Sequence, residues 1–257
     1  MNTLDKIFVI NLYKDTERLS KFTSQLSRNN WKFSRFDAIT PDHSEYNNLK
    51  KKYISGKSLT SGEVGCALSH ISLLEKCAYT EGLDRILIFE DDATTYVTGT
   101  EIDRLLKEHY HYLRHHNIPE SDVLYLGKGQ DKCGKLELVH DKVYRTFRPL
   151  CCHAYIVTKK GAKRLLSTKP FKQPYDFIAP NASDQNLVTL MAFHPSIYYQ
   201  DILSTESNLR NMNKTFNNIN ECSCSDDLSV WFWIVVALLG ITLIVLGIGC
   251  WKYFQVK

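Results

Sequence analysis

Short apolar runs and amphipathic stretches alternate along residues 6–191 of the chain. The apolar runs predict β-strands, and they cover residues 6–12, 31–39, 86–89, 123–126 and 154–157. The third run, ILIF, is continuous, as in a strand that is covered on both faces. Strands that alternate with helices predict an α/β domain with a mainly parallel sheet between helices.

Apolar residues at spacings of three and four predict the helices. The first helix carries Leu19, Phe22 and Leu26 on one face. The second begins at Thr60, because Thr60 and Glu63 can cap each other's free backbone donors. Its buried stripe consists of Val64, Leu68, Ile71, Leu74 and Ala78. Two further helices are expected after capping residues: 159–166 after Thr158 and 184–191 after Ser183.

A hydrophobic segment near the C-terminus differs in composition from everything before it. Residues 230–251, VWFWIVVALLGITLIVLGIGCW, contain no charged residue, and as a helix they can cross the roughly 30 Å of hydrocarbon in a bilayer. Trp and Tyr side chains near both ends favour the headgroup region. We therefore expect a folded domain at 1–207, an Asn- and Ser-rich linker at 208–229, one C-terminal transmembrane helix at 230–251 in a lipid bilayer, and a short tail at 252–257.

The orientation of this anchor is a separate expectation. The N-terminal segment lacks the long apolar region of a signal peptide, so we expect a C-terminal anchor with the folded domain in the cytosol. The lysines after the apolar segment and the aspartates before it run counter to the positive-inside tendency. The sequons that begin at Asn181 and Asn213 would be glycosylated only in a lumenal domain, so they report the orientation.

Charge and cysteine content narrow the choice of partners. The 257 residues include 32 basic and 28 acidic ones, a net charge of +4 that is too small and too mixed to indicate nucleic acid as a partner. The eight cysteines are scattered without CxxC pairs, so reduced thiols are expected. Cys66 and His70 would share a helix face at i and i+4, where a metal site is conceivable, but core packing is the favoured interpretation.

An acidic triplet directly follows the apolar run at 86–89. Glu90, Asp91 and Asp92 therefore lie at the carboxyl end of a buried strand, where open α/β sheets bind their ligands. Carboxylate oxygens suit Mn²⁺ or Mg²⁺, and Glu90 and Asp92 project to the same side of an extended segment. A metal held there would neutralise a diphosphate. The alternative is a solvated turn without a ligand.

Eight separated segments together form a pattern that extends along most of the folded region. The most specific are IFVINLYKDTERL at 7–19, FDAIT at 36–40, LTSGEVGCALSHISLLEK at 59–76 and ILIFEDDA at 86–93. The less specific are DVLYLG at 122–127, HAYIVTKKGAKRLL at 153–166, QPYDFI at 173–178 and HPSIYYQD at 194–201. In their order and residues these segments resemble glycosyltransferase family 25, which contains bacterial lipooligosaccharide galactosyltransferases and collagen galactosyltransferases. The sequence departs from the family pattern after Ala38, where Ile39-Thr40-Pro41 stands in place of an acidic residue and Gly.

The resemblance implies a GT-A fold, a UDP-sugar donor that is commonly UDP-galactose, a divalent cation, and sugar transfer with inversion to a glycan or protein hydroxyl. It places the nucleotide-sugar near Asn11, Leu12, Arg18, Glu63, Ser69, His70, Glu90 and Asp91, and the metal on Asp92 and Glu90. An inverting transfer needs a carboxylate base beside the acceptor. Asp176 is the first candidate and Asp184 the second, although both could instead cap helices.

Two other functions are compatible with the same residues. The fold could persist without catalysis in a sugar-binding or scaffold protein, and the intact acidic triplet and Asp176 argue against this. A metal-dependent phosphodiesterase or nucleotidyltransferase would need the second acidic cluster or His-rich spacing of two-metal chemistry, which the sequence lacks.

Overall fold

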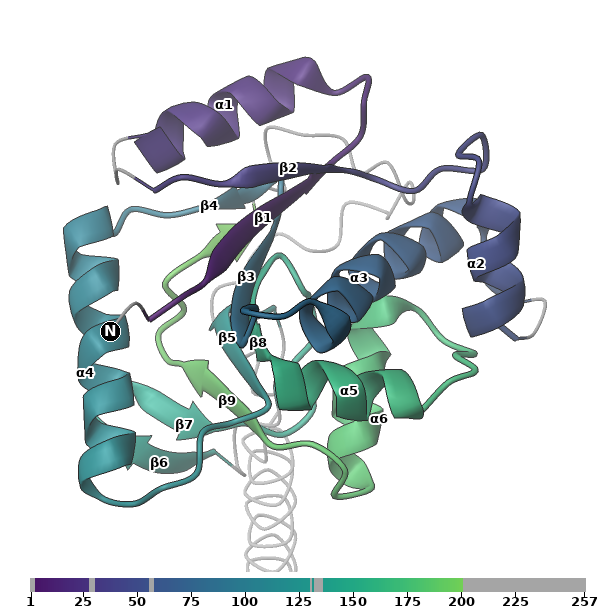
Figure 1. Cartoon of the computed structure of the whole chain (residues 1–257). Coiled ribbons are helices and arrows are strands. Elements are labelled where there is room, and N and C mark those ends of the chain that lie inside the picture. Colours follow the sequence, from purple (N-terminus) through teal and green to yellow (C-terminus); the bar gives the residue numbers. More distant parts are fainter. Residues whose placement is uncertain (1–2, 28–30, 56–57, 130, 132–135, 201–257) are drawn as a thin grey trace, which may run out of the picture. The chain divides into compact units, whose positions relative to one another are not determined.

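The computed structural model describes residues 3–27, 31–55, 58–129, 131 and 136–200 (Figure 1). Within these residues no helix is long and apolar enough to cross a membrane. The expected linker, transmembrane helix and tail, 208–257, lie outside the described residues and remain predictions.

A mixed eight-stranded sheet forms the centre of the described region. Its strands are β1 (Lys6–Asn11), β2 (Ser34–Asp37), β3 (Arg85–Glu90), β5 (Val123–Gly127), β6 (Glu137–His140), β7 (Val143–Arg145), β8 (Ala154–Thr158) and β9 (Leu190–Phe193). They lie in the order β2-β1-β3-β8-β5-β9-β7-β6. Six of the eight run in one direction, and β8 and β7 run opposite to them. A second, two-stranded sheet pairs β4 (Ala93–Thr94) with β10 (Tyr199–Gln200).

Helices cover both faces of the sheet (Figure 1). They are α1 (Thr16–Ser27), α2 (Tyr46–Tyr53), α3 (Ser61–Tyr79), α4 (Gly99–His115), α5 (Lys159–Ser167), the short 3₁₀ helix η2 (Tyr175–Phe177) and α6 (Ile178–Asp184). Alternate strand residues point to opposite faces, so two buried clusters form. One joins the strands to α2, α3, α5 and α6, and the other joins them to α1 and α4.

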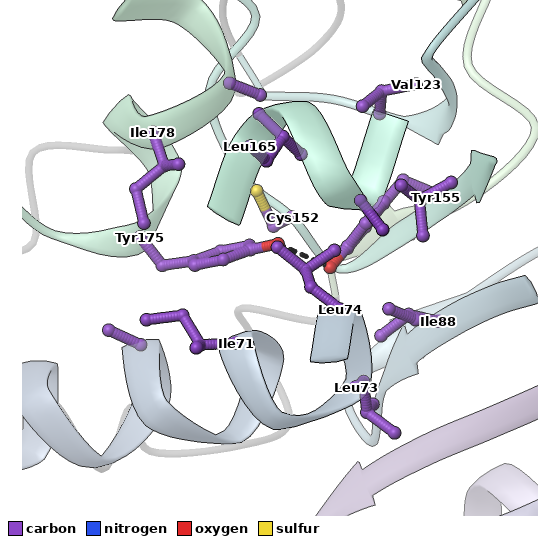
Figure 2. Packing of buried hydrophobic residues seen from close by; sticks show 14 of the residues in the cluster. Ile71, Leu73, Leu74, Ile88, Val123, Cys152, Tyr155, Leu165, Tyr175 and Ile178 are labelled. Atoms are coloured by element: carbon purple, nitrogen blue, oxygen red, sulfur yellow. Dashed lines mark hydrogen bonds between the residues drawn. The ribbon is translucent and has the colours of Figure 1, made fainter. Parts of the chain in front are cut away.

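Helix α3 is the best-buried helix of the first cluster, as its sequence predicts. Thr60 Oγ1 accepts a hydrogen bond from the backbone N–H of Glu63 at 3.2 Å, and Glu63 Oε2 accepts one from the N–H of Thr60 at 2.9 Å. This reciprocal capping box confirms the predicted start. Figure 2 shows Ile71 and Leu74 of α3 packed against residues of β8, η2 and α5.

The predicted sheet is correct in its main direction, but β8 and β7 run antiparallel to the other strands. Strand β8 inserts antiparallel between β3 and β5, with Arg85 opposite Thr158 and Phe89 opposite Ala154. The chain between β5 and β8 contains the β6–β7 hairpin and no described helix that could carry it back to the starting edge. A strand reached without such a crossover pairs antiparallel.

The predicted helix at 184–191 is wrong. Asp184 ends α6, and the chain turns at Asn186, whose φ is +57° and whose N–H donates to the Ser183 carbonyl. Residues Leu190–Phe193 then form β9, which pairs in parallel with β5. The apolar run LMAF is fully buried in the sheet, and this burial outweighs its fit to a helical period.

Candidate active site

The acidic triplet lies where β1 and β3 end side by side. Ile10 is opposite Glu90 in their parallel register, so Asn11, the last residue of β1, lies next to the residues that follow β3. Asn11 Nδ2 donates to Asp91 Oδ2 at 2.6 Å and to the Asp15 carbonyl at 2.9 Å. The predicted neighbourhood of Asn11 and the triplet is therefore present.

Arg18 of α1 reaches the same carboxylates. Its Nη2 lies 2.6 Å from Asp91 Oδ1 and 3.2 Å from Asp92 Oδ2. Gln200 Nε2, from β10, donates to Asp92 Oδ2 at 3.0 Å. The Asp91 and Asp92 side chains are 8% and 14% exposed, so one arginine and two amides hold a pair of largely buried acids.

Burial and the charges of neighbouring carboxylates oppose ionisation of Glu90 and Asp91. Burial, followed by the charges of Asp92 and Asp176, raises the pKa of Glu90 well above its usual range. Burial also raises the pKa of Asp91, while the Asn11 hydrogen bond and the Arg18 charge oppose this shift. A cation bound to these oxygens would favour the charged forms.

The donor set fits a hard divalent cation. Asp92 Oδ1 is buried and has no hydrogen-bond partner among the described residues, whereas Asp92 Oδ2 is already paired. A buried, unpaired carboxylate oxygen is costly unless a ligand completes it. Asp92 Oδ1, together with Glu90, therefore offers oxygen ligands for Mn²⁺ or Mg²⁺.

His70 lies behind the triplet in a buried polar chain. Its Nε2 is 3.0 Å from Glu90 Oε1 and its Nδ1 is 3.0 Å from the Tyr155 hydroxyl. That hydroxyl is 2.8 Å from the Tyr175 hydroxyl, and the Tyr175 ring stacks on His70 with centroids 4.2 Å apart (Figure 2 shows the two tyrosines). Burial lowers the pKa of His70 to about 3, so the ring is neutral at pH 7.

Three of the residues assigned to the nucleotide-sugar have local structural partners. Glu63 caps α3 through Thr60. Ser69 Oγ accepts from the Ile39 N–H and donates to the Gly65 carbonyl, both at 2.8 Å, which fastens residues 36–40 to α3. The Leu12 carbonyl accepts from the Asp15 N–H at 2.9 Å. These contacts hold the loops around the triplet.

The two candidate bases have different surroundings. Asp176 follows Tyr175 in η2, and its negative charge acts on both His70 and Glu90. Its charge is therefore felt at the Glu90 end of the triplet. Asp184 ends α6, forms an ion pair with Arg148, and has a half-exposed side chain.

Sequence reasoning missed several residues around the triplet. The His153 carbonyl accepts from the Glu90 N–H at 2.9 Å, and the His153 ring Nε2 lies 3.1 Å from the Tyr198 carbonyl. Gln200, Tyr155 and Tyr175 were missed as well. The antiparallel insertion of β8 brings His153 and Tyr155 here, and no local pattern signals it.

A cavity of about 390 Å³ lies away from these residues. It is formed by α4 and the β6–β7 hairpin, and its lining includes His111, His115, His116 and His140. It contains none of the predicted site residues. The chemistry of the triplet, rather than cavity size, therefore identifies the candidate site.

Comparison with known proteins identifies the family of the chain. The sequence profile of glycosyltransferase family 25, described as LPS biosynthesis protein, matches residues 4–179. The chain belongs to glycosyltransferase family 25. The matched range contains the triplet, α3 and Asp176, and it confirms the family resemblance of the sequence motifs.

The similar proteins include one named for lipooligosaccharide biosynthesis and one named as inactive. The lipooligosaccharide biosynthesis protein lic2B of Haemophilus influenzae is 36% identical over 104 residues, which cover 39% of this chain and 37% of lic2B. Human inactive glycosyltransferase 25 family member 3 is 29% identical over 199 residues, 71% of this chain and 32% of that protein. The chain thus spans about a third of the length of these relatives.

Among solved structures, one similar chain is a Drosophila β-1,4-galactosyltransferase 7 mutant in complex with manganese, UDP-Gal and xylobiose. The TM-score is 0.43 at 11% identity, and the alignment covers 87% of this chain and 82% of that one.

Proposed function

We propose that this chain is a membrane-anchored glycosyltransferase with a GT-A-type fold. It transfers a sugar, galactose, from a UDP-sugar to a hydroxyl group of a glycan or protein, with inversion at the anomeric carbon. The observation that carries the proposal is the partly buried triplet Glu90–Asp92 at the end of β3, beside the end of β1. Arg18 pairs with Asp91 and Asp92, and the charge of Asp176 acts on Glu90.

The UDP-sugar donor binds at the carboxyl ends of β1 and β3, where these residues lie. Asn11, Leu12 and Arg18 contact the nucleotide, and Asp92 and Glu90 hold Mn²⁺ or Mg²⁺. When bound, this cation neutralises the charge that develops on the departing diphosphate. Arg18 lies 2.6 Å from Asp91 and would supply a second positive charge near the same phosphates.

The acceptor binds on the opposite side of the sugar. Inversion requires its hydroxyl to attack from the face away from the diphosphate, and a carboxylate there takes the proton. We assign this role to Asp176 because it lies in η2, next to Tyr175, which stacks on His70, and because its charge acts on both His70 and Glu90. Neutral His70 does not compete for the proton, since burial keeps its pKa at about 3.

Loss of catalysis is the second candidate, and one contact favours it. Arg18 Nη2 bonds to both Asp91 and Asp92, which places a positive charge against oxygens that a metal would use. A human relative is also named inactive. A chain of this kind would bind a nucleotide-sugar or glycan without turning it over.

Product analysis separates the two functions. The full-length chain, purified in detergent micelles, is incubated with a panel of UDP-sugars, glycan and peptide acceptors, and Mn²⁺. A glycosylated product, with Asp92→Asn as the inactive control, supports the transferase. Donor binding without product under any of these conditions supports the inactive scaffold.

A further inference from the structure

A second group of possible ligands lies beside the acidic triplet. The ligand atoms of Cys66, His70 and Glu90 all lie within 4.8 Å of one another. Cys66 and His70 are one helical turn apart on α3, and Glu90 comes from the end of β3. One sulfur, one imidazole nitrogen and one carboxylate oxygen form a softer donor set than the carboxylates of Asp91 and Asp92.

The positions require little change to hold a tetrahedral ion. Zinc lies about 2.0–2.3 Å from nitrogen, oxygen and sulfur ligands, which separates two ligand atoms by roughly 3.4–3.8 Å. His70 Nε2 and Glu90 Oε1 are 3.0 Å apart. Side-chain rotations that move the ligand atoms by about 1 Å therefore bring all three to zinc-binding distance.

The surroundings of His70 match those of a metal-bound histidine. Such a ring uses one nitrogen for the metal and bonds the other to an oxygen, which fixes its orientation. His70 Nδ1 is 3.0 Å from the Tyr155 hydroxyl, and Tyr155 is in turn 2.8 Å from the Tyr175 hydroxyl. With Nδ1 donating to Tyr155, the lone pair of Nε2 points toward Glu90 and Cys66.

We propose that Cys66, His70 and Glu90 bind Zn²⁺, or a similar thiophilic divalent cation, at a site that adjoins the proposed Mn²⁺ site on Asp92 and shares Glu90 with it. The Cys66 thiol loses its proton to solvent as the sulfur–zinc bond forms, and a water completes the tetrahedron. Because Glu90 would serve both sites, zinc withdraws a ligand from the donor site. This inhibitory consequence rests on the proposed transferase function, whereas zinc binding does not.

Cobalt provides a spectroscopic test that needs no sugar. The metal-free full-length chain in detergent micelles is titrated with Co²⁺, and we expect one equivalent to produce a thiolate-to-cobalt charge-transfer band that Zn²⁺ abolishes. Cys66→Ser and Cys66→Ala should lose the band. Cys77→Ser is the matched control on α3, because Cys77 Sγ faces the Leu83 and Val157 carbonyls instead, and it should keep the band.

Tyr155→Phe tests the hydrogen bond that orients His70. It keeps the three ligands, so the band should persist with cobalt affinity lower by about 10–100-fold.

The proposal is overturned if the wild-type chain shows no thiolate band, or if both Cys66 variants keep it while their circular dichroism is native. In the transfer assay, zinc should inhibit the wild type more than Cys66→Ser. A chain without transferase activity would leave the cobalt result unaffected, so the two proposals fail separately.

Discussion

The three acidic side chains at the end of β3 have different hydrogen-bond and ion-pair partners, although they are neighbours in sequence. Glu90 is tied to His70, Asp91 to Asn11 and Arg18, and Asp92 to Arg18 and Gln200. Only Asp92 has a buried carboxylate oxygen without a partner in the described part of the chain. Substitutions within the triplet should therefore have different effects.

Asp92→Asn should abolish metal-dependent donor binding and leave the fold intact. The change removes the negative charge while keeping the side-chain size, and it relieves repulsion with Glu90. Calorimetric titration of UDP with and without Mn²⁺ measures the effect. Asp37→Asn, at a largely exposed position paired with Arg35, is the control. Unchanged UDP affinity of the Asp92 variant in Mn²⁺ would remove Asp92 from the metal site.

Asp176→Asn should keep donor binding and lower turnover by a factor on the order of 10² to 10⁴, the usual contribution of a general base. Steady-state transfer rates at saturating donor provide the measurement. Asp184→Asn, which only breaks the ion pair with Arg148, should remain active. The opposite pattern would assign the base to Asp184.

At the scale of elements, helix α3 and the loop at 36–40 act as one unit. Gly65 lies so close to this loop that an added Cβ would collide with the Ile39 carbonyl oxygen. Gly65→Ala should therefore destabilise the chain by about 1–3 kcal/mol, the usual cost of overpacking. Urea unfolding measures this, with Ser72→Ala on the same helix as the control. Equal stability of the two variants would show that the loop yields freely.

Helix α4 carries a buried histidine that should make stability depend on pH. Burial, followed by the charge of His140, lowers the pKa of His109 to about 3. The unfolded chain takes up a proton near pH 6.5 and the folded chain does not, so stability is present above pH 6.5 and is lost as pH falls toward 3.

The free energy of unfolding should fall by up to about 1.4 kcal/mol per pH unit below 6.5 because of His109. His109→Gln should flatten this part of the profile, measured by urea unfolding between pH 7 and 5. His111→Gln, at an exposed position of the same helix, should retain the wild-type slope. Parallel profiles for all three proteins would contradict the assignment.

Local sequence signals specified most elements and part of the site. The capping box of Thr60 and Glu63, the ILIF strand and the acidic triplet were all predicted. Helix α4 was missed, although Thr98 caps it and its buried residues recur at helical spacing. The neighbours of Glu90 contributed by β8 could not be predicted, because pairing between distant strands depends on tertiary packing rather than on either segment.

At the scale of the whole molecule, the transmembrane helix that we propose at 230–251 would determine on which side of a membrane the folded domain lies. If the folded domain is cytosolic, the chain expressed in eukaryotic cells should show no endoglycosidase-sensitive shift in mass. Protease added to intact microsomes should then digest the domain. A glycan at Asn213 together with protection from protease would reverse this orientation. Asn213→Gln is the control that identifies the glycan's position.

The insertion of β8 also sets the order in which this protein can be completed during synthesis. Strand β3 acquires its second neighbour only when residues 154–158 have left the ribosome, although its own residues emerge much earlier. Until then one edge of the apolar strand Ile86–Phe89 has no partner on that side, and such edges promote association between nascent chains. Because the strand that completes the surroundings of Glu90 is made late, we expect chaperones to bind the half-synthesised chain.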